Sequence, residues 1–98
     1  MSNAILIVAG ERRRRGQGRR ERLLAAIRAL LRARPATSSI CPSDAARIAG
    51  GPRWRTLLPK AREVARDAAR AGEVVVTQRS KKLDPATQWS GPIRIRLP

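Results

Sequence analysis

The last quarter of the chain carries the pattern that most restricts the fold. Residues 73–79 are rich in β-branched side chains and follow Gly72, while residues 92–97 alternate apolar and charged side chains with a period of two. Both patterns predict strands, and the second is typical of a strand with one buried face. We expect the two strands to pair antiparallel. The connection between them is too long for a tight hairpin and predicts a long basic loop, which includes Lys81 and Lys82.

Helical periodicity predicts two helices in the first half of the chain. In residues 19–34 the apolar side chains fall on one stripe, while several arginines point away from it. A short strand or extended linker is expected at residues 37–41. A brief second helix then follows at residues 44–49, capped by Ser43 or Asp44.

A third helix is the longest regular element expected. Residues 53–58 lead into it, its first turn takes Pro59, where early N–H groups have no helical partner, and Gly72 caps its end. Its buried face is expected to hold Leu57, Ala61, Val64, Ala68 and Ala71. The order is therefore helix, short strand, helix, helix, strand, loop, strand. This order predicts a small α+β winged helix-turn-helix with three helices and a two- to three-stranded antiparallel hairpin sheet, whose long loop is the wing.

Net charge indicates the class of partner. The 98 residues include 22 Lys and Arg against 7 Asp and Glu, for a net charge of +15. Residues 1–22 hold seven of the bases and two of the acids, or +5, so the remainder carries +10. A field of this size attracts polyanions, which makes nucleic acid or an acidic protein the expected partner.

The beginning of the chain differs in composition from the rest. We expect residues 1–18 to form a flexible basic arm and residues 19–98 to form the winged-helix domain; residues 2–4 (Ser-Asn-Ala) match a cloning scar. A run of four arginines cannot bury an apolar face, which favours disorder, with phosphate binding as the functional alternative. The apolar residues 5–8, bounded by Ile5 and Val8, leave two options open. They stay disordered, or they add as a strand to a sheet edge, which in a neighbouring chain would create a dimer.

Several function classes are excluded by what the sequence lacks. It has no His, the commonest general base, and no phosphate-binding, dinucleotide or nucleophile motif, so we expect no enzyme and no catalytic residue. A single cysteine, Cys41, cannot form an intramolecular disulfide or a zinc finger, so no metal site or cofactor is expected. We expect Cys41 to be a small buried residue rather than a reactive thiol. Without a membrane span or signal peptide, the expected location is cytoplasmic.

Nucleic-acid binding has the strongest support from the residues themselves. The third helix places arginines away from its apolar stripe, and its approach and the wing add further bases. The candidate contact residues are Arg53, Arg55, Lys60, Arg62, Arg66, Arg70, Lys81 and Lys82. The helix has no Asn or Gln for adenine and only Thr56 for smaller contacts, so phosphate and shape contacts with duplex DNA are favoured over base readout.

Two acids on the same helix keep another interpretation open. Glu63 with Arg66, and Asp67 with Arg70, would form i,i+3 ion pairs on a solvated face. A protein-interaction winged helix that binds an acidic partner is therefore the second function considered. RNA or ribosome binding is the third.

The two tryptophans bear on this choice. Two Trp with no Phe or Tyr disfavour the stacking platforms that single-strand and RNA-sheet binders use. Trp54, just before the third helix, is expected to be a lid on the core. Trp89, in the wing, either contacts a partner or packs back on the sheet.

Three stretches together resemble domain of unknown function family 3253, an uncharacterised bacterial family. They are residues 39–47 (S-I-C-P-S-D-A-A-R), residues 54–62 (W-R-T-L-L-P-K-A-R) and, within residues 76–97, V-T-Q-R, L-D-P-A-T and G-P-I-R-I-R-L. The resemblance covers roughly residues 23–98. It implies a winged-helix-like domain and no established activity, ligand or catalytic residue. The arm before Arg19 departs from the family pattern.

Overall fold

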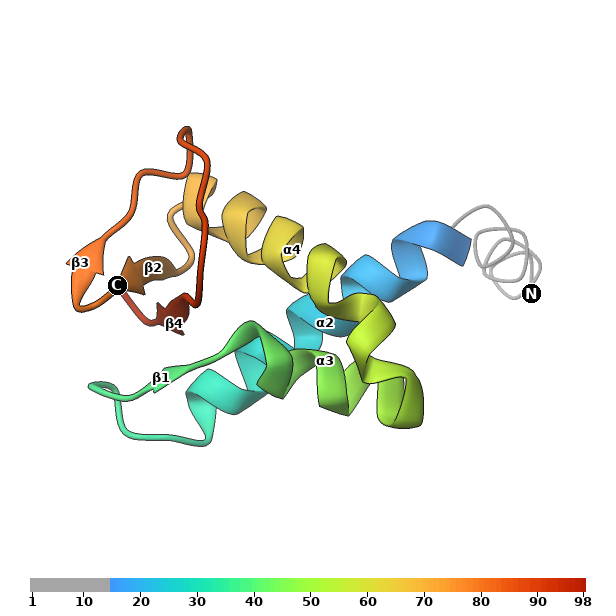
Figure 1. Ribbon diagram of the computed structural model, residues 1–98. Helices are drawn as coiled ribbons and strands as arrows, with labels where there is room; N and C mark the ends of the chain where they lie inside the picture. Colours follow the sequence, from blue (N-terminus) through green and yellow to red (C-terminus); the bar gives the residue numbers. More distant parts are fainter. Residues whose placement is uncertain (1–14) are drawn as a thin grey trace, which may run out of the picture.

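A computed structural model describes residues 15–98 of the chain, in which helices lie on one side and a small sheet on the other (Figure 1). The helices are α2 (Arg15–Arg32), α3 (Pro42–Gly50), the 3₁₀ helix η1 (Gly51–Leu57) and α4 (Leu58–Arg70). The predicted α+β class is confirmed. The first helix begins four residues before its expected position and ends two residues earlier. The predictions for residues 1–14, including the extra strand at residues 5–8, lie outside the described residues.

The sheet is larger than the sequence predicted. Its strands are β1 (Ser39–Ile40), β2 (Val75–Gln78), β3 (Lys81–Lys82) and β4 (Arg94–Arg96). They lie in the order β1-β4-β2-β3, and every neighbouring pair is antiparallel. The predicted pairing of the two main strands is confirmed, with Val76 opposite Ile95. The prediction of two to three strands was wrong, because the described residues form four.

A tight turn, which the sequence analysis did not expect, separates β2 from β3. Arg79 and Ser80 have φ values of 51° and 70°, and Gln78 pairs with Lys81 across them. Positive φ at both central residues is what a two-residue type I′ hairpin requires. The basic segment after β2 is therefore a short hairpin, and the long loop begins only after Lys82.

Helix α3 begins with a cap that differs from the predicted one. Cys41 is the N-cap residue and Pro42 the first helical residue, so the helix starts two residues before the predicted Asp44. Asp44 lies at the third helical position, and its Oδ2 accepts a hydrogen bond of 2.8 Å from the Cys41 backbone N–H. This is the reciprocal half of a capping box, which explains why Ser43 is not the cap.

Helix α4 starts and stops as the sequence predicts. Pro59 lies in its first turn, and Gly72 follows its last residues with φ +75°. The Gly72 N–H donates to the Ala69 carbonyl at 3.0 Å, and the Glu73 N–H donates to the Ala68 carbonyl at 2.9 Å. These two bonds form a Schellman cap, a geometry that favours glycine at this position.

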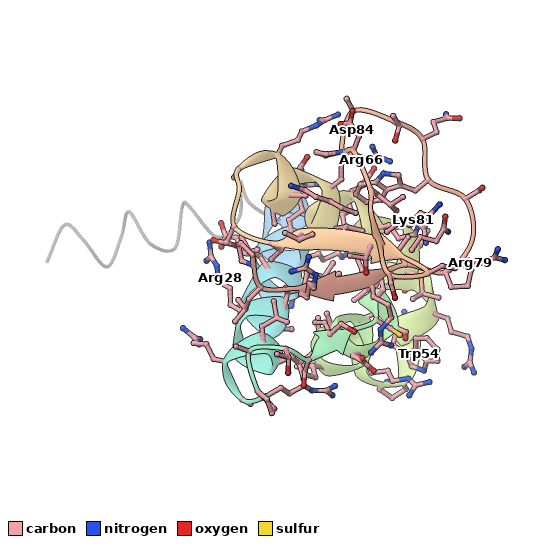
Figure 2. All side chains as sticks on the ribbon, turned by 90° about the vertical axis from the view of Figure 1, so that its left-hand side faces the viewer. Arg28, Trp54, Arg66, Arg79, Lys81 and Asp84 are labelled. Carbon is pink, nitrogen blue, oxygen red and sulfur yellow. The ribbon has the colours of Figure 1, made fainter. Side chains whose placement is uncertain are left out.

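One core lies between the helices and the inner face of the sheet, which Figure 2 shows in front of the helices. Its largest fully buried side chains are Leu23, Ile27, Ile40, Ile93, Ile95 and Val76. On α4 the buried residues are Ala61, Val64, Ala65 and Ala68. The predicted burial of Ala71 was wrong, because the residue lies beyond the last helical turn and is exposed, and Cys41 is half-buried rather than fully buried.

Candidate nucleic-acid interface

The link between α3 and α4 is a corner that depends on two glycines. A Cβ at Gly50 would lie only 2.7 Å from Leu57 Cδ1, so a side chain there would push against η1. Gly51 has φ +54°, a conformation that L side chains rarely adopt. The close approach and the turn together set the position of η1, which carries Arg53, Trp54 and Arg55.

Trp54 lies between α3 and η1 and collects two arginines. Its ring is half-buried and packs against the core, as the sequence analysis expected of a lid. The guanidinium carbons of Arg47 and Arg55 each lie 4.5 Å from the centroid of the ring. Arg55 was a predicted site residue, but Arg47 was not, because it lies seven residues from Trp54 in the sequence on a different helix.

The other two predicted bases near this corner differ in their surroundings. Arg53 is exposed, and its backbone carbonyl accepts a hydrogen bond of 2.7 Å from the Thr56 hydroxyl. Lys60 lies 3.8 Å from a carboxylate oxygen of Glu63. The charge of Lys60 is therefore partly compensated, whereas within residues 15–98 no carboxylate pairs with Arg53.

The arginines of α4 point away from the core, but they contact the long loop rather than open solvent. Arg62 donates to the Gly91 carbonyl at 3.0 Å and to the Trp89 carbonyl at 3.1 Å. Arg66 donates to the Thr87 carbonyl at 2.6 Å and to the Pro85 carbonyl. Arg70 is more exposed and makes one weak bond of 3.5 Å to Pro85.

Other side chains complete the attachment of this loop. The Arg66 guanidinium lies 4.1 Å from the centroid of the Trp89 ring, and the Trp89 indole N–H donates to the Asp84 carbonyl at 2.9 Å. Gln78 donates from β2 to the carbonyls of Ser90 at 2.6 Å and Pro92 at 3.1 Å. Of the two alternatives for Trp89, the structure therefore favours packing within the molecule, against Arg66 and the loop itself.

The hairpin formed by β2 and β3 presents a second group of bases. The side chains of Lys81 and Lys82 are exposed, as is Arg79 in the turn between the strands. Within the described part of the chain, none of the three pairs with a carboxylate. Figure 2 shows Arg79, Lys81 and Trp54 toward the same side of the molecule, opposite Arg28. Arg79 was not predicted as a contact residue, because the sequence analysis placed it inside a strand.

The opposite side of the molecule, between α2 and α4, combines bases with acids. Arg20 forms ion pairs with Asp67 and, at 3.6 Å, with Glu63. Arg28 pairs with Glu73 at 2.6 Å, and the hydrogen bond to this carboxylate raises the pKa of the Arg28 guanidinium. These pairs border an open groove with a volume of about 500 Å³.

The two ion pairs predicted on α4 fared differently. Asp67 and Arg70 approach to 4.0 Å, so this pair is present at the limit of an ion pair. The predicted pair between Glu63 and Arg66 is not formed, because Arg66 turns to the loop carbonyls and Glu63 contacts Lys60 and Arg20.

The described residues thus divide the predicted site into three groups. Arg53, Arg55, Lys81 and Lys82 have no carboxylate partner within residues 15–98, Lys60 and Arg70 lie beside acids, and Arg62 and Arg66 bind loop carbonyls. The same range contains no group of three acidic, Cys or His side chains that could ligate a metal ion. Among its helices, each is too short or too polar to cross a lipid bilayer.

Comparison with known proteins places the chain in a family. No curated protein matches its sequence. The model of the family described as "Protein of unknown function (DUF3253)" matches residues 20–98. Since this match spans most of the chain, including both groups of unpaired bases, the chain belongs to the DUF3253 family.

Proposed function

We propose that this chain is a non-enzymatic winged-helix protein that binds duplex DNA through backbone phosphates. The observation that carries the proposal is the separation of charge across the molecule. The acids Glu63, Asp67 and Glu73 pair with bases of α2 and α4. The bases of η1 and of the hairpin have no such partner in the described part of the chain. A surface of this kind attracts the regularly spaced charges of a nucleic-acid backbone.

The order of the elements supports a winged helix. A helix, a short strand and two further helices precede three strands, with η1 as the link into α4. In this interpretation, the wing consists of the hairpin and of residues 83–93. A DNA-binding winged helix uses a helix and a wing together, and the hydrogen bonds from Arg62 and Arg66 hold these two parts in one relative position.

The arginines of α4 then have an indirect part in binding. A backbone carbonyl carries no net charge, so Arg62 and Arg66 keep their positive charge while they bind the loop. Their charge adds to the field that a phosphate experiences, as do Lys60 and Arg70 to a smaller extent. The direct contacts are assigned to Arg53, Arg55, Lys81 and Lys82. Backbone contacts are favoured over base readout because the hydroxyl of Thr56 already donates to the Arg53 carbonyl.

The test is a fluorescence-anisotropy titration of a random duplex at several salt concentrations. The variant Lys81→Gln/Lys82→Gln is compared with Arg22→Gln/Arg32→Gln, which removes the same charge from exposed positions on α2. Every variant retains residues 1–18, so their contribution is common to all. Because each neutralised phosphate contributes about −0.9 to the log–log salt slope, the hairpin variant should have a slope smaller by roughly 2, and the α2 variant should match the unsubstituted chain.

Two outcomes would reject this function. If the unsubstituted chain has no affinity for the duplex at low salt, DNA is not its ligand. If both variants lose the same salt dependence, the attraction depends on net charge alone. Binding of a polyglutamate peptide without binding of the duplex would favour the acidic-protein alternative.

A further inference from the structure

The group formed by Arg47, Trp54 and Arg55, called the arginine–tryptophan stack below, points to a specific contact. The two guanidinium groups come from different elements, α3 and η1, yet both lie 4.5 Å from the same ring. Neither side chain makes a hydrogen bond or an ion pair within residues 15–98. Stacking uses the flat face of a guanidinium and leaves the N–H groups at its edge available.

The position of the stack is set by the core. Trp54 packs against the buried residues, and Gly50 allows η1 to lie directly on α3. An arginine on an open surface loses rotational freedom when it binds a ligand. In the stack, contact with the ring already restricts both arginines, so less freedom remains to be lost on binding.

The chemistry of the stack fits a phosphate. An arginine presents two parallel N–H groups to the oxygens of one phosphate, and it does so best when its plane is fixed. The nearest acid in sequence, Asp44, is occupied by the backbone N–H of Cys41. Two oriented guanidinium groups on the same side of the molecule as the hairpin match a ligand whose anionic groups recur along its length (Figure 2).

We infer that Arg47 and Arg55, oriented by Trp54, bind backbone phosphates of the duplex at a position separate from the hairpin. This inference rests on the proposed function and extends it to Arg47 and Trp54. Trp54 acts as a positioning residue: it holds the two arginines and makes no contact of its own with a base.

The experiment uses the full chain and the same random duplex. Arg47→Gln/Arg55→Gln removes two exposed charges and should leave the fold intact, which circular dichroism checks. Arg22→Gln/Arg32→Gln is the charge-matched control. The stack variant should lower the salt slope by roughly 2, whereas the control should leave the slope unchanged.

A second measurement separates orientation from charge. In a Trp89→Phe background, Trp54 is the only tryptophan, so its fluorescence reports on the stack. Addition of duplex should change the emission, and Arg47→Gln/Arg55→Gln should abolish the change. Trp54→Leu keeps both charges and should weaken binding several-fold, because the arginines are no longer held.

The outcomes distinguish this inference from the function on which it rests. If Lys81→Gln/Lys82→Gln lowers the slope and the stack variant does not, the DNA function stands and the stack is not a phosphate site. If the unsubstituted chain does not bind the duplex, both are overturned. If the stack variant loses binding of polyglutamate but not of the duplex, the stack serves an acidic protein instead.

Discussion

Arginines on the two sides of α4 have different partners. Toward α2, Arg20 binds the carboxylates of Asp67 and Glu63. Toward the loop, Arg62 and Arg66 bind backbone carbonyls. The first arrangement cancels charge, and the second uses the guanidinium to hold a loop while its charge remains. Net charge therefore does not measure the charge available to a partner, which depends on the groups that each arginine contacts.

The largest effect is expected from Arg66→Ala. The substitution removes the contact with Trp89 and the hydrogen bonds to the carbonyls of Thr87 and Pro85. Hydrogen bonds to charged groups contribute more than neutral ones, so the free energy of unfolding should fall by about 2 kcal/mol. Urea denaturation measures this change. Arg70→Ala is the control, since its single bond to the loop is 3.5 Å long, and it should change stability by less than about 0.5 kcal/mol.

Equal effects of the two substitutions would contradict the importance of the loop carbonyls. A fall in stability without a change in the fluorescence of Trp89 would contradict the contact between Trp89 and Arg66.

A smaller effect, of opposite sign, is expected from Ser80→Gly. Ser80 has φ 70°, which glycine adopts without strain, so the substitution should raise the free energy of unfolding by roughly 0.5 kcal/mol. It leaves the charges of the hairpin unchanged and thus separates order from charge in this region. Ser90→Gly serves as control, because φ of Ser90 is not positive, and it should not stabilise the protein. Stabilisation by both substitutions would show that the turn geometry is not the cause.

The smallest effect is expected for the ion pair between Arg20 and Asp67. A double-mutant cycle with Arg20→Gln and Asp67→Asn should give a coupling energy of about 0.5 kcal/mol at low salt, because both side chains are partly exposed. The coupling should decrease toward zero in 1 M salt, where the Debye length is about 3 Å. The effect of Arg66→Ala should change less with salt, since its partners are uncharged. An equal salt dependence of both would remove the distinction between the two sides of α4.

Periodicity predicted the main elements because it depends on burial, which repeats along the chain. The pairing of β2 with β4 and the buried face of α4 both follow from alternation of apolar and polar residues. The short strand β3 was missed for a local reason. Arg79 and Ser80 carry no strong signal for a turn with positive φ, and two lysines do not suggest a strand.

The partners of the candidate site residues could not be predicted in the same way. Periodicity placed Arg62 and Arg66 away from the core, but it did not indicate that a loop more than 15 residues later returns to cover them. Backbone carbonyls are present at every residue and therefore leave no signal in a sequence. The contact of Arg47 with Trp54 depends on the corner at Gly50 and Gly51, whose geometry is a tertiary property.

The position of β3 also bears on self-association. The strand forms one edge of the sheet, is two residues long, and consists of exposed lysines. An exposed edge is a template on which another chain can add, and short, charged strands oppose such addition. The hairpin lysines thus discourage intermolecular sheets in addition to any contact with a ligand. Substitution by valine would remove both effects together, and aggregation would then be mistaken for loss of affinity; glutamine, which is polar and of low β-propensity, keeps the two apart.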